Sequence, residues 1–232
     1  MTPEVRHSVI KWIAQAALGA VGYAAVIFLS AGTLRWVWGW VMVIIIALVL
    51  IAHPLLLIPL NPELLAERQK GARDQGVKRW DKVITTLLGA AMLLVWIVAG
   101  LDYRWGWTGP LPLWVHLGGL LFVLLGYALF LWAMVSNAYF SEGVRIQTER
   151  GHAVVTGGPY RFVRHPGYVG VIVTHLAMPF LLGSWWALLP AAAVALLCLR
   201  RTALEDRTLL AELPGYATYA AQTPYRLLPR IW

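Results

Sequence analysis

The residues from Gly158 to Tyr168 carry the densest set of polar and reactive side chains in this sequence. This run combines guanidinium, imidazole and phenol groups with two prolines and two glycines. An apolar stretch without Lys, Arg, Asp or Glu begins within it and reaches Leu199. Polar groups at the edge of a membrane span are energetically expensive and usually mark a functional site. We therefore expect this run to bind a charged ligand beside lipid.

The composition predicts that the elements positioning these groups are membrane helices. Of the 232 residues, 59% are hydrophobic and 13% are charged, whereas soluble domains carry about 25% charged residues. A single membrane span needs roughly 20 apolar residues. Five stretches without charged residues meet or nearly meet that length: Trp12–Leu34, Trp36–Pro62, Val83–Leu101, Trp105–Ser141 and His165–Leu199. We therefore expect an all-α integral membrane protein.

The positive charges are distributed asymmetrically along the chain, whose net charge is +8. Every Lys and Arg except Arg35 and Arg104 lies near the N-terminus, in segments 61–82 and 136–164, or after Leu199. This is the positive-inside pattern of multi-pass membrane proteins. It predicts that both termini and the two long loops are cytoplasmic. The basic excess then reflects topology and attraction to anionic membrane lipids, not nucleic-acid binding.

The hydrophobic pattern predicts about six transmembrane or membrane-embedded helices. The expected elements are four helices at Val9–Leu29, Trp38–Leu60, Val83–Leu101 and Leu113–Val135, and a hairpin of two short arms between Tyr168 and Leu199. Trp36, Trp38 and Trp40 are typical of an interfacial aromatic belt. The hairpin is expected to turn at Gly183-Ser184.

Two cytoplasmic segments join these helices. After Asn61, which can cap a short helix with Pro62 at its first position, segment 61–82 is expected to be a solvated connecting loop. Segment 136–165 is rich in glycine and β-branched residues and is expected to be ordered but not helical. Connections of that length are usually functional or disordered. The tail from Arg200 is expected to form an amphipathic cytoplasmic helix with an extended end.

These elements suggest a four-helix N-terminal part, residues 1–135, and a C-terminal core, residues 136–232, within one compact membrane domain. Because the hairpin arms are antiparallel, His165 and Arg200 should emerge at the same membrane face. Gln147–Val155, Tyr160–Tyr168 and Arg200–Asp206 would then converge on one cytoplasmic pocket. The alternative is that these cations and tyrosines only anchor the chain at the interface, and Arg164 is expected to contact lipid headgroups only.

Several other site classes lack support in the sequence. It contains none of the phosphate-binding, dinucleotide-binding or H-E-x-x-H motifs. The six histidines are too scattered for a metal site. The single cysteine, Cys198, excludes an intrachain disulfide and is expected to be a small buried hydrophobic residue.

The C-terminal part resembles the isoprenylcysteine carboxyl methyltransferase family. The similarity covers roughly 136–232 and depends on an ordered combination of motifs, with matching spacing to a later Arg-x-x-x-Glu pair and to the end of the tail. The motifs are His152-Ala-Val-Val155, Gly158-Pro-Tyr160, Arg164-His-Pro-Gly-Tyr168-Val-Gly170, Arg201 with Glu205, and Gly215-Tyr-Ala-Thr-Tyr219 with Arg226-Leu-Leu-Pro229. The first four helices match this family only as generic apolar helices.

The resemblance implies S-adenosylmethionine (SAM) as cofactor, bound by the loop between the fourth and fifth helices and by the tail. It implies a lipophilic substrate that enters from the bilayer, with Arg201 facing that substrate, and no particular oligomeric state. The implied cofactor contacts are Gln147, His152, Ala153, Val154, Val155, Tyr160, His165, Pro166, Gly167, Tyr168 and Glu205. No metal is implied, and the role of Asp206 stays open.

These residue types suit methyl transfer to a carboxylate, which is ionised at neutral pH and needs no general base. Arg201 could orient the carboxylate through its planar fork, unless it only pairs with Glu205 one helical turn away. The family default is the carboxyl group of a prenylated cysteine. Alternatives are a phospholipid amine or another lipid as acceptor, an NADPH-dependent sterol-type reductase, and a non-catalytic membrane scaffold.

Overall fold

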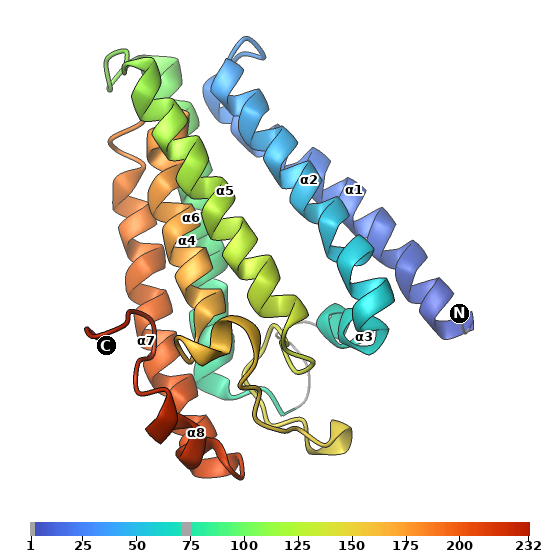
Figure 1. Ribbon diagram of the computed structural model, residues 1–232. Helices are drawn as coiled ribbons and strands as arrows, with labels where there is room; N and C mark the ends of the chain where they lie inside the picture. The colour runs from blue at the N-terminus through green and yellow to red at the C-terminus, as the bar shows by residue number, and fades with distance from the viewer. Residues whose placement is uncertain (1–2, 71–75) are drawn as a thin grey trace.

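The computed structural model, which describes residues 3–70 and 76–232, consists of six long helices and several short ones (Figure 1). Its elements are α1 (Pro3–Ala31), α2 (Val37–Leu60), α3 (Pro62–Lys70), α4 (Arg79–Trp105), α5 (Leu113–Val135), the 3-10 helices η2 (Thr148–Arg150) and η3 (Gly158–Arg161), α6 (Pro166–Leu182), α7 (Leu188–Glu212) and α8 (Tyr216–Gln222). The described part of the chain contains no strand, which confirms the all-helical class.

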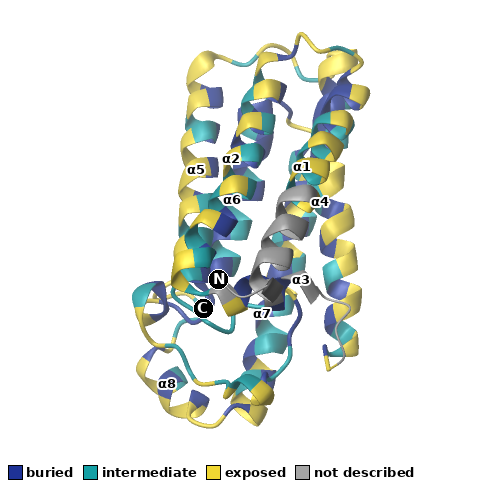
Figure 2. Cartoon of the chain, turned by 90° about the vertical axis from the view of Figure 1, so that its right-hand side faces the viewer, coloured by how far each residue is buried: buried dark blue, intermediate teal, exposed yellow. Residues whose placement is uncertain are grey.

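Three of the long helices, α2, α4 and α5, are long and apolar enough to cross a membrane. Two further apolar helical segments are shorter, namely 15–31 within α1 and the whole of α6. Many outward-facing positions on these helices are exposed (Figure 2), and large hydrophobic residues such as Leu48 and Leu121 are among them. The structure therefore indicates a membrane protein.

Helices α5 and α6 pack closely against each other. A Cβ atom built on Gly126 would lie 2.8 Å from the backbone oxygen of Gly170, and one on Gly119 would lie 2.3 Å from the backbone nitrogen of Leu181. Small residues allow helix backbones to approach this closely, as is common between membrane helices. This contact fixes the position from which the chain enters and leaves segment 136–165.

A hydrophobic core joins α1 and α2 to α4 and α6. It includes Ile27 of α1, Met42 of α2, Val95 of α4 and Met178 of α6, all of which have no exposed surface. Trp36 also belongs to it, because its ring is only 2% exposed and stacks on Tyr103 at 4.9 Å. The predicted belt is therefore wrong at this residue: Trp36 packs in the interior.

The second arm of the predicted hairpin does not end at Leu199. α7 continues without a break to Glu212 and carries Arg201, Glu205 and Asp206 on its last turns. No Gly or Pro interrupts the sequence between Pro190 and Pro214, so the helix has no reason to stop where polarity rises. The turn before α7 is at Gly183, which has a positive φ of 78°, as predicted.

Segment 61–82 is more than a solvated connection. Asn61 caps α3, accepting a hydrogen bond from the backbone N–H of Leu64 at 3.0 Å, as predicted. However, Leu64, Leu65, Glu67 and Arg68 are buried, so α3 packs against its neighbours with one face. Part of this segment, 71–75, lies outside the described residues.

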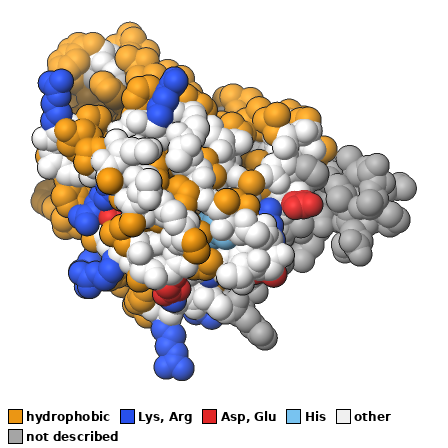
Figure 3. Space-filling view, turned by 60° about the horizontal axis from the view of Figure 1, so that its bottom comes forward, with side chains coloured by type: hydrophobic (Ala, Val, Ile, Leu, Met, Phe, Trp, Pro, Cys, Tyr) orange, Lys and Arg blue, Asp and Glu red, His pale blue; other side chains and the backbone are white. Residues whose placement is uncertain are grey.

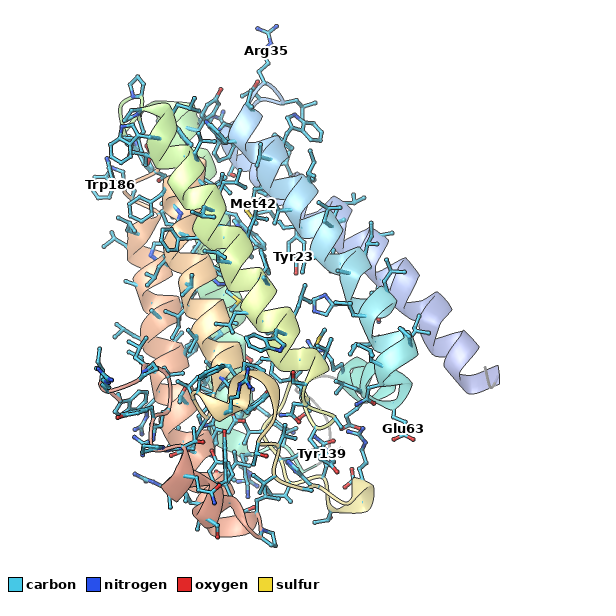
Figure 4. The ribbon with its side chains drawn as sticks, in the orientation of Figure 1. Tyr23, Arg35, Met42, Glu63, Tyr139 and Trp186 are labelled. Atoms are coloured by element: carbon cyan, nitrogen blue, oxygen red, sulfur yellow. The ribbon has the colours of Figure 1, made fainter. Side chains whose placement is uncertain are left out.

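The polar segments gather at one end of the bundle (Figure 1). α3, α8 and the 136–165 connection lie there, and this connection is non-helical except for η2 and η3. Figure 4 shows Glu63 and Tyr139 at this end and Arg35 and Trp186 at the other. Lys and Arg side chains are spread over the same end in Figure 3.

Candidate functional site

A cavity of about 410 Å³ lies among the segments gathered at this end. Its walls come from α3, α4, α5, α6, α7 and α8, and from the 136–165 connection. Small-molecule sites have volumes of roughly 300–1,000 Å³ and combine apolar walls with a few polar groups. The size and lining of this cavity therefore suit a small-molecule ligand.

The structure brings most of the predicted site residues to this cavity. Those in its lining are His152, Ala153, Val154, Val155, Tyr160, His165, Gly167, Tyr168, Arg201 and Glu205. They come from three segments separated in sequence, which meet because α6 and α7 are antiparallel and α8 folds back against the connection. Their individual contacts with a cofactor stay predictions.

Two predicted cofactor residues, Gln147 and Pro166, are not in the cavity lining. Gln147 has no exposed surface. Its side-chain nitrogen donates to the backbone oxygen of Tyr139 at 2.9 Å, and its side-chain oxygen accepts from Arg150 at 2.5 Å. Gln147 therefore braces the connection internally. Pro166 begins α6 and is buried.

Glu205 is held at the cavity by Tyr168. The phenol of Tyr168 donates a hydrogen bond to Oε2 of Glu205 at 2.5 Å, joining the first turn of α6 to α7. Glu205 is half-buried, and its second carboxylate oxygen can accept a hydrogen bond from a ligand amine or hydroxyl group. Among the described residues, Glu205 makes no ion pair with Arg201. The alternative that Arg201 only pairs with Glu205 one helical turn away is therefore not what the structure shows.

Arg201 is paired with Asp81, a residue that the sequence did not single out. Its Nε and Nη2 donate to Oδ1 and Oδ2 of Asp81 at 2.7 and 3.0 Å, and Nη2 also donates to the backbone oxygen of Glu142 at 2.6 Å. Asp81 has no exposed surface and also accepts from the backbone N–H of Val144 at 2.7 Å. One edge of the Arg201 fork is therefore already engaged.

Arg201 nevertheless lies at the wall of the cavity. Its guanidinium carbon is 5.4 Å from the centre of the Tyr168 ring, within the range of a cation–π contact. Asp81 and Tyr168 thus fix the guanidinium from two sides. A guanidinium held in this way can orient an anion without moving.

Asp206, whose role the sequence left open, joins the tail to the start of α6. The carboxylate has no exposed surface. Arg164 donates to both of its oxygens at 2.8 Å, Arg226 donates to Oδ2 at 2.8 Å, and the Tyr216 hydroxyl donates to Oδ1 at 2.9 Å. His165 Nε2 lies 3.2 Å from Oδ1. Burial alone would raise the pKa of Asp206, but hydrogen bonds from His165, Arg164 and Arg226 hold it well below its usual value.

The expected contact of Arg164 with lipid headgroups is therefore wrong. Its guanidinium is buried, and Nη1 donates to the backbone oxygens of Thr223 and Pro224 at 2.8 and 2.7 Å. The backbone N–H groups of Arg164 and His165 also donate to the carbonyls of Tyr225 and Arg226. These contacts attach the end of the chain to the wall of the cavity.

Aromatic residues close the cavity on the side of the connection and α8. Tyr160 is buried, and its backbone oxygen accepts from the Tyr219 hydroxyl at 2.6 Å. The pKa of the Tyr160 phenol is raised by burial, so it stays a neutral donor at physiological pH. Tyr216 and Tyr219 of α8 are buried as well and also line the cavity.

His152 faces the cavity as a neutral imidazole. Its Nδ1 accepts from the backbone N–H of Gln147 at 3.2 Å, and its ring stacks on Tyr139 at 4.4 Å. Burial and the nearby charges of Arg150 and Arg145 lower its pKa to about 4. Nδ1 is thus the acceptor and Nε2 carries the proton.

The described residues contain no group of three or more His, Cys, Asp or Glu side chains that could hold a metal ion. Cys198 is buried, as predicted.

Comparison with known proteins shows which family and which relative this chain resembles. Residues 119–211 match the isoprenylcysteine carboxyl methyltransferase (ICMT) family. The cobalt-zinc-cadmium resistance protein CzcN of Cupriavidus metallidurans is 30% identical over 161 residues, which are 66% of this chain and 62% of that protein. The matched region thus spans less than two thirds of this relative. The family match includes α6 and nearly all of α7, with Tyr168, Arg201 and Glu205 at the cavity. Residues 119–211 of this chain, which hold these three side chains, are thus similar to the ICMT family.

Proposed function

We propose that this protein is a membrane methyltransferase that uses SAM and acts on a lipophilic acceptor. The observation that carries this proposal is the lining of the cavity. All of the residues that the family resemblance assigns to the cofactor or substrate, except Gln147 and Pro166, surround one space of about 410 Å³. A scaffold would have no need for such a convergence of polar groups beside apolar helices.

The side chains around the cavity suit SAM. Val154, Val155 and Tyr160 provide apolar and aromatic walls for a base or ribose ring, and Glu205 provides a carboxylate for amine or hydroxyl groups. The bound cofactor would supply a methyl group on a positively charged sulfur. Tyr168 keeps the Glu205 carboxylate in place, so that no reorganisation is needed when the ligand binds.

For the acceptor we propose a lipid-borne carboxylate, with the prenylated cysteine of the family as the default and a phospholipid amine as the alternative. A carboxylate is already a nucleophile at neutral pH, so the protein needs only to align and desolvate it. Arg201 would orient one carboxylate oxygen with the guanidinium edge that Asp81 leaves open. The packed tail, fixed by Asp206, would exclude water.

We further propose that the cavity opens on the cytoplasmic side, with both chain ends on that side. The support is the charge pattern. At the opposite end, the described Lys and Arg residues are only Arg35, between α1 and α2, and Arg104, in the last turn of α4. The cavity end carries the other described Lys and Arg residues outside α1. The positive-inside rule assigns such an end to the cytoplasm.

The experiment that tests the enzyme class is ligand binding to the purified protein. S-adenosylhomocysteine should raise the melting temperature in a saturable manner, and NADPH should not, because a ligand stabilises only the state that binds it. Glu205→Gln should weaken this effect, whereas Glu212→Gln, at a carboxylate outside the cavity lining, should leave it unchanged. A shift with NADPH alone would support the reductase, and a shift with neither would support the scaffold.

The acceptor can be found by incubating the protein with lipid extracts and isotopically labelled SAM. Mass spectrometry should then detect a labelled methyl ester on a lipid acid. A labelled methylamine would instead identify the phospholipid amine.

A further inference from the structure

Arg68 of α3 is a buried cation at the cavity wall that neither the sequence motifs nor the matched family region includes. Its side chain is 9% exposed and contributes to the cavity lining. Nη1 donates to the backbone oxygen of Phe140 at 3.1 Å. Nε is buried and has no hydrogen-bond partner within the described part of the chain. Buried polar groups without partners are rare in native proteins and call for an explanation.

The charge of Arg68 is compensated less closely than that of the other buried arginines at the cavity. Arg164 and Arg201 have carboxylate oxygens at 2.8 and 2.7 Å, on fully buried aspartates. Among the described residues, the ion-pair partner of Arg68 is Glu142, whose carboxylate lies 3.6 Å from Nη2 on a side chain that is 41% exposed. A solvent-exposed carboxylate at that distance is screened and offsets little of the cost of burying a cation.

The surroundings of Arg68 indicate the chemistry of its missing partner. Glu142 lies between two guanidinium groups. Its side chain faces Arg68, and its backbone oxygen accepts a hydrogen bond from Arg201. Phe130 of α5, Met92 of α4 and Val171 of α6 add apolar side chains to the same cavity. A ligand that satisfies both features has an anionic head and a hydrocarbon tail.

We propose that Arg68 binds the carboxylate of the lipid acceptor, in concert with Arg201. This inference rests on the proposed methyltransferase function and assigns recognition of the acceptor's charge to α3 in the N-terminal part of the chain. Arg201, held by Asp81, aligns the reacting oxygen. Arg68 attracts the carboxylate because Glu142 leaves most of its positive charge uncompensated. Recognition therefore depends on the negative charge and disappears when the acid becomes its methyl ester.

The test compares an acid with its own ester. Dissociation constants are measured in the presence of S-adenosylhomocysteine for N-acetyl-S-farnesylcysteine and its methyl ester, and for palmitate and methyl palmitate. Loss of a charge-assisted hydrogen bond costs about tenfold or more in affinity. Arg68→Gln should therefore weaken binding of the acid by about that factor, with the ester unaffected. The prenyl and fatty-acid pairs distinguish the two sources of a lipid carboxylate.

Two further variants keep the test decisive. Glu142→Gln removes the competing carboxylate and should strengthen binding of the acid relative to the ester. Arg161→Gln removes an exposed cation outside the cavity lining and should change neither. If Arg68→Gln does not fold, Arg68→Lys replaces it and should keep a preference for the acid.

The outcomes separate the inference from the function on which it rests. If the wild-type protein does not bind S-adenosylhomocysteine, the proposed function fails. If it binds S-adenosylhomocysteine but Arg68→Gln weakens acid and ester equally, Arg68 only braces the 140–142 segment and the inference is wrong. An unchanged acid-to-ester ratio in Glu142→Gln would also contradict it.

Discussion

At the scale of single residues, the Asp206 carboxylate is buried and held by several hydrogen-bond donors. It has no exposed surface and accepts hydrogen bonds from Arg164, Arg226 and Tyr216. Removing one partner of a buried ion pair leaves the other charge uncompensated, which costs about 3–5 kcal/mol. Asp206→Asn should therefore lower the free energy of unfolding by about that amount, measured by denaturation of the detergent-solubilised protein.

The matched control for Asp206 is Glu212, on the same helix. It pairs with Lys78 at 2.7 Å, but its side chain is 43% exposed. Exposed ion pairs contribute about 0–1 kcal/mol, so Glu212→Gln should have little effect. Similar losses in the two variants would show that the buried network around Asp206 does not hold the tail in place.

The lowered pKa of His152 should make the stability of the protein depend on pH. Because its pKa is about 4 in the folded protein, against an ordinary value of 6.5, the folded state stays neutral where the unfolded chain takes up a proton. Protonation therefore favours unfolding, and this contribution to stability is lost as pH falls from 6.5 towards 4. The melting temperature of His152→Gln should depend less steeply on pH in that window than that of the wild type. Identical slopes would contradict this.

The structure brings predicted site residues to the cavity together where their motif is local. His165, Gly167 and Tyr168 are close in sequence, and the turn into α6 brings them to the cavity together. Asp81 was missed because its partner, Arg201, lies 120 positions away, and no local pattern marks one acid among basic neighbours. Arg68 was missed for the same reason, since only the packing of α3 shows that it is buried.

At the scale of elements, the positions of the long helices could be predicted because lipid requires continuous apolar segments. The ends of the helices were harder to predict. α7 passes Leu199 because its polar residues find partners in α4, α6 and the tail, and this information is absent from the hydrophobic pattern. The inward packing of α3 was missed because its few apolar residues make a short segment look like a solvated loop.

The contact between α5 and α6 can be tested at two adjacent glycines. A Cβ atom at Gly119 would lie 2.3 Å from the backbone nitrogen of Leu181, which cannot move without displacing α6. Gly119→Ala should therefore destabilise the protein by about 1–3 kcal/mol, as overpacking typically does. Gly118→Ala is the control, because nothing lies within 4 Å of its added Cβ atom. Equal melting temperatures for the two variants would contradict this close approach.

At the scale of the whole molecule, the two ends of the bundle differ in chemistry. The end opposite the cavity is held by Asp102, which is buried and accepts hydrogen bonds from Thr108 and Ser184 in the two turns there. Exposed tryptophans such as Trp107 and Trp186 surround these turns, as is typical of a membrane interface. The cavity end instead carries α3, α8 and most of the basic residues. This difference between the two ends supports the proposed cytoplasmic side for the cavity.

Labelling with a membrane-impermeant maleimide tests that orientation. Arg35 and Glu63 are exposed and lie at opposite ends of the bundle (Figure 4), and the native Cys198 is buried, so it should give little background. In intact spheroplasts, Arg35→Cys should be labelled and Glu63→Cys should be protected until the membrane is permeabilised, because the positive-inside rule assigns the Glu63 end to the cytoplasm. The reverse pattern would place the cavity on the outer side, where intracellular SAM could not reach it, and the proposed methyltransferase would then lose its cofactor supply.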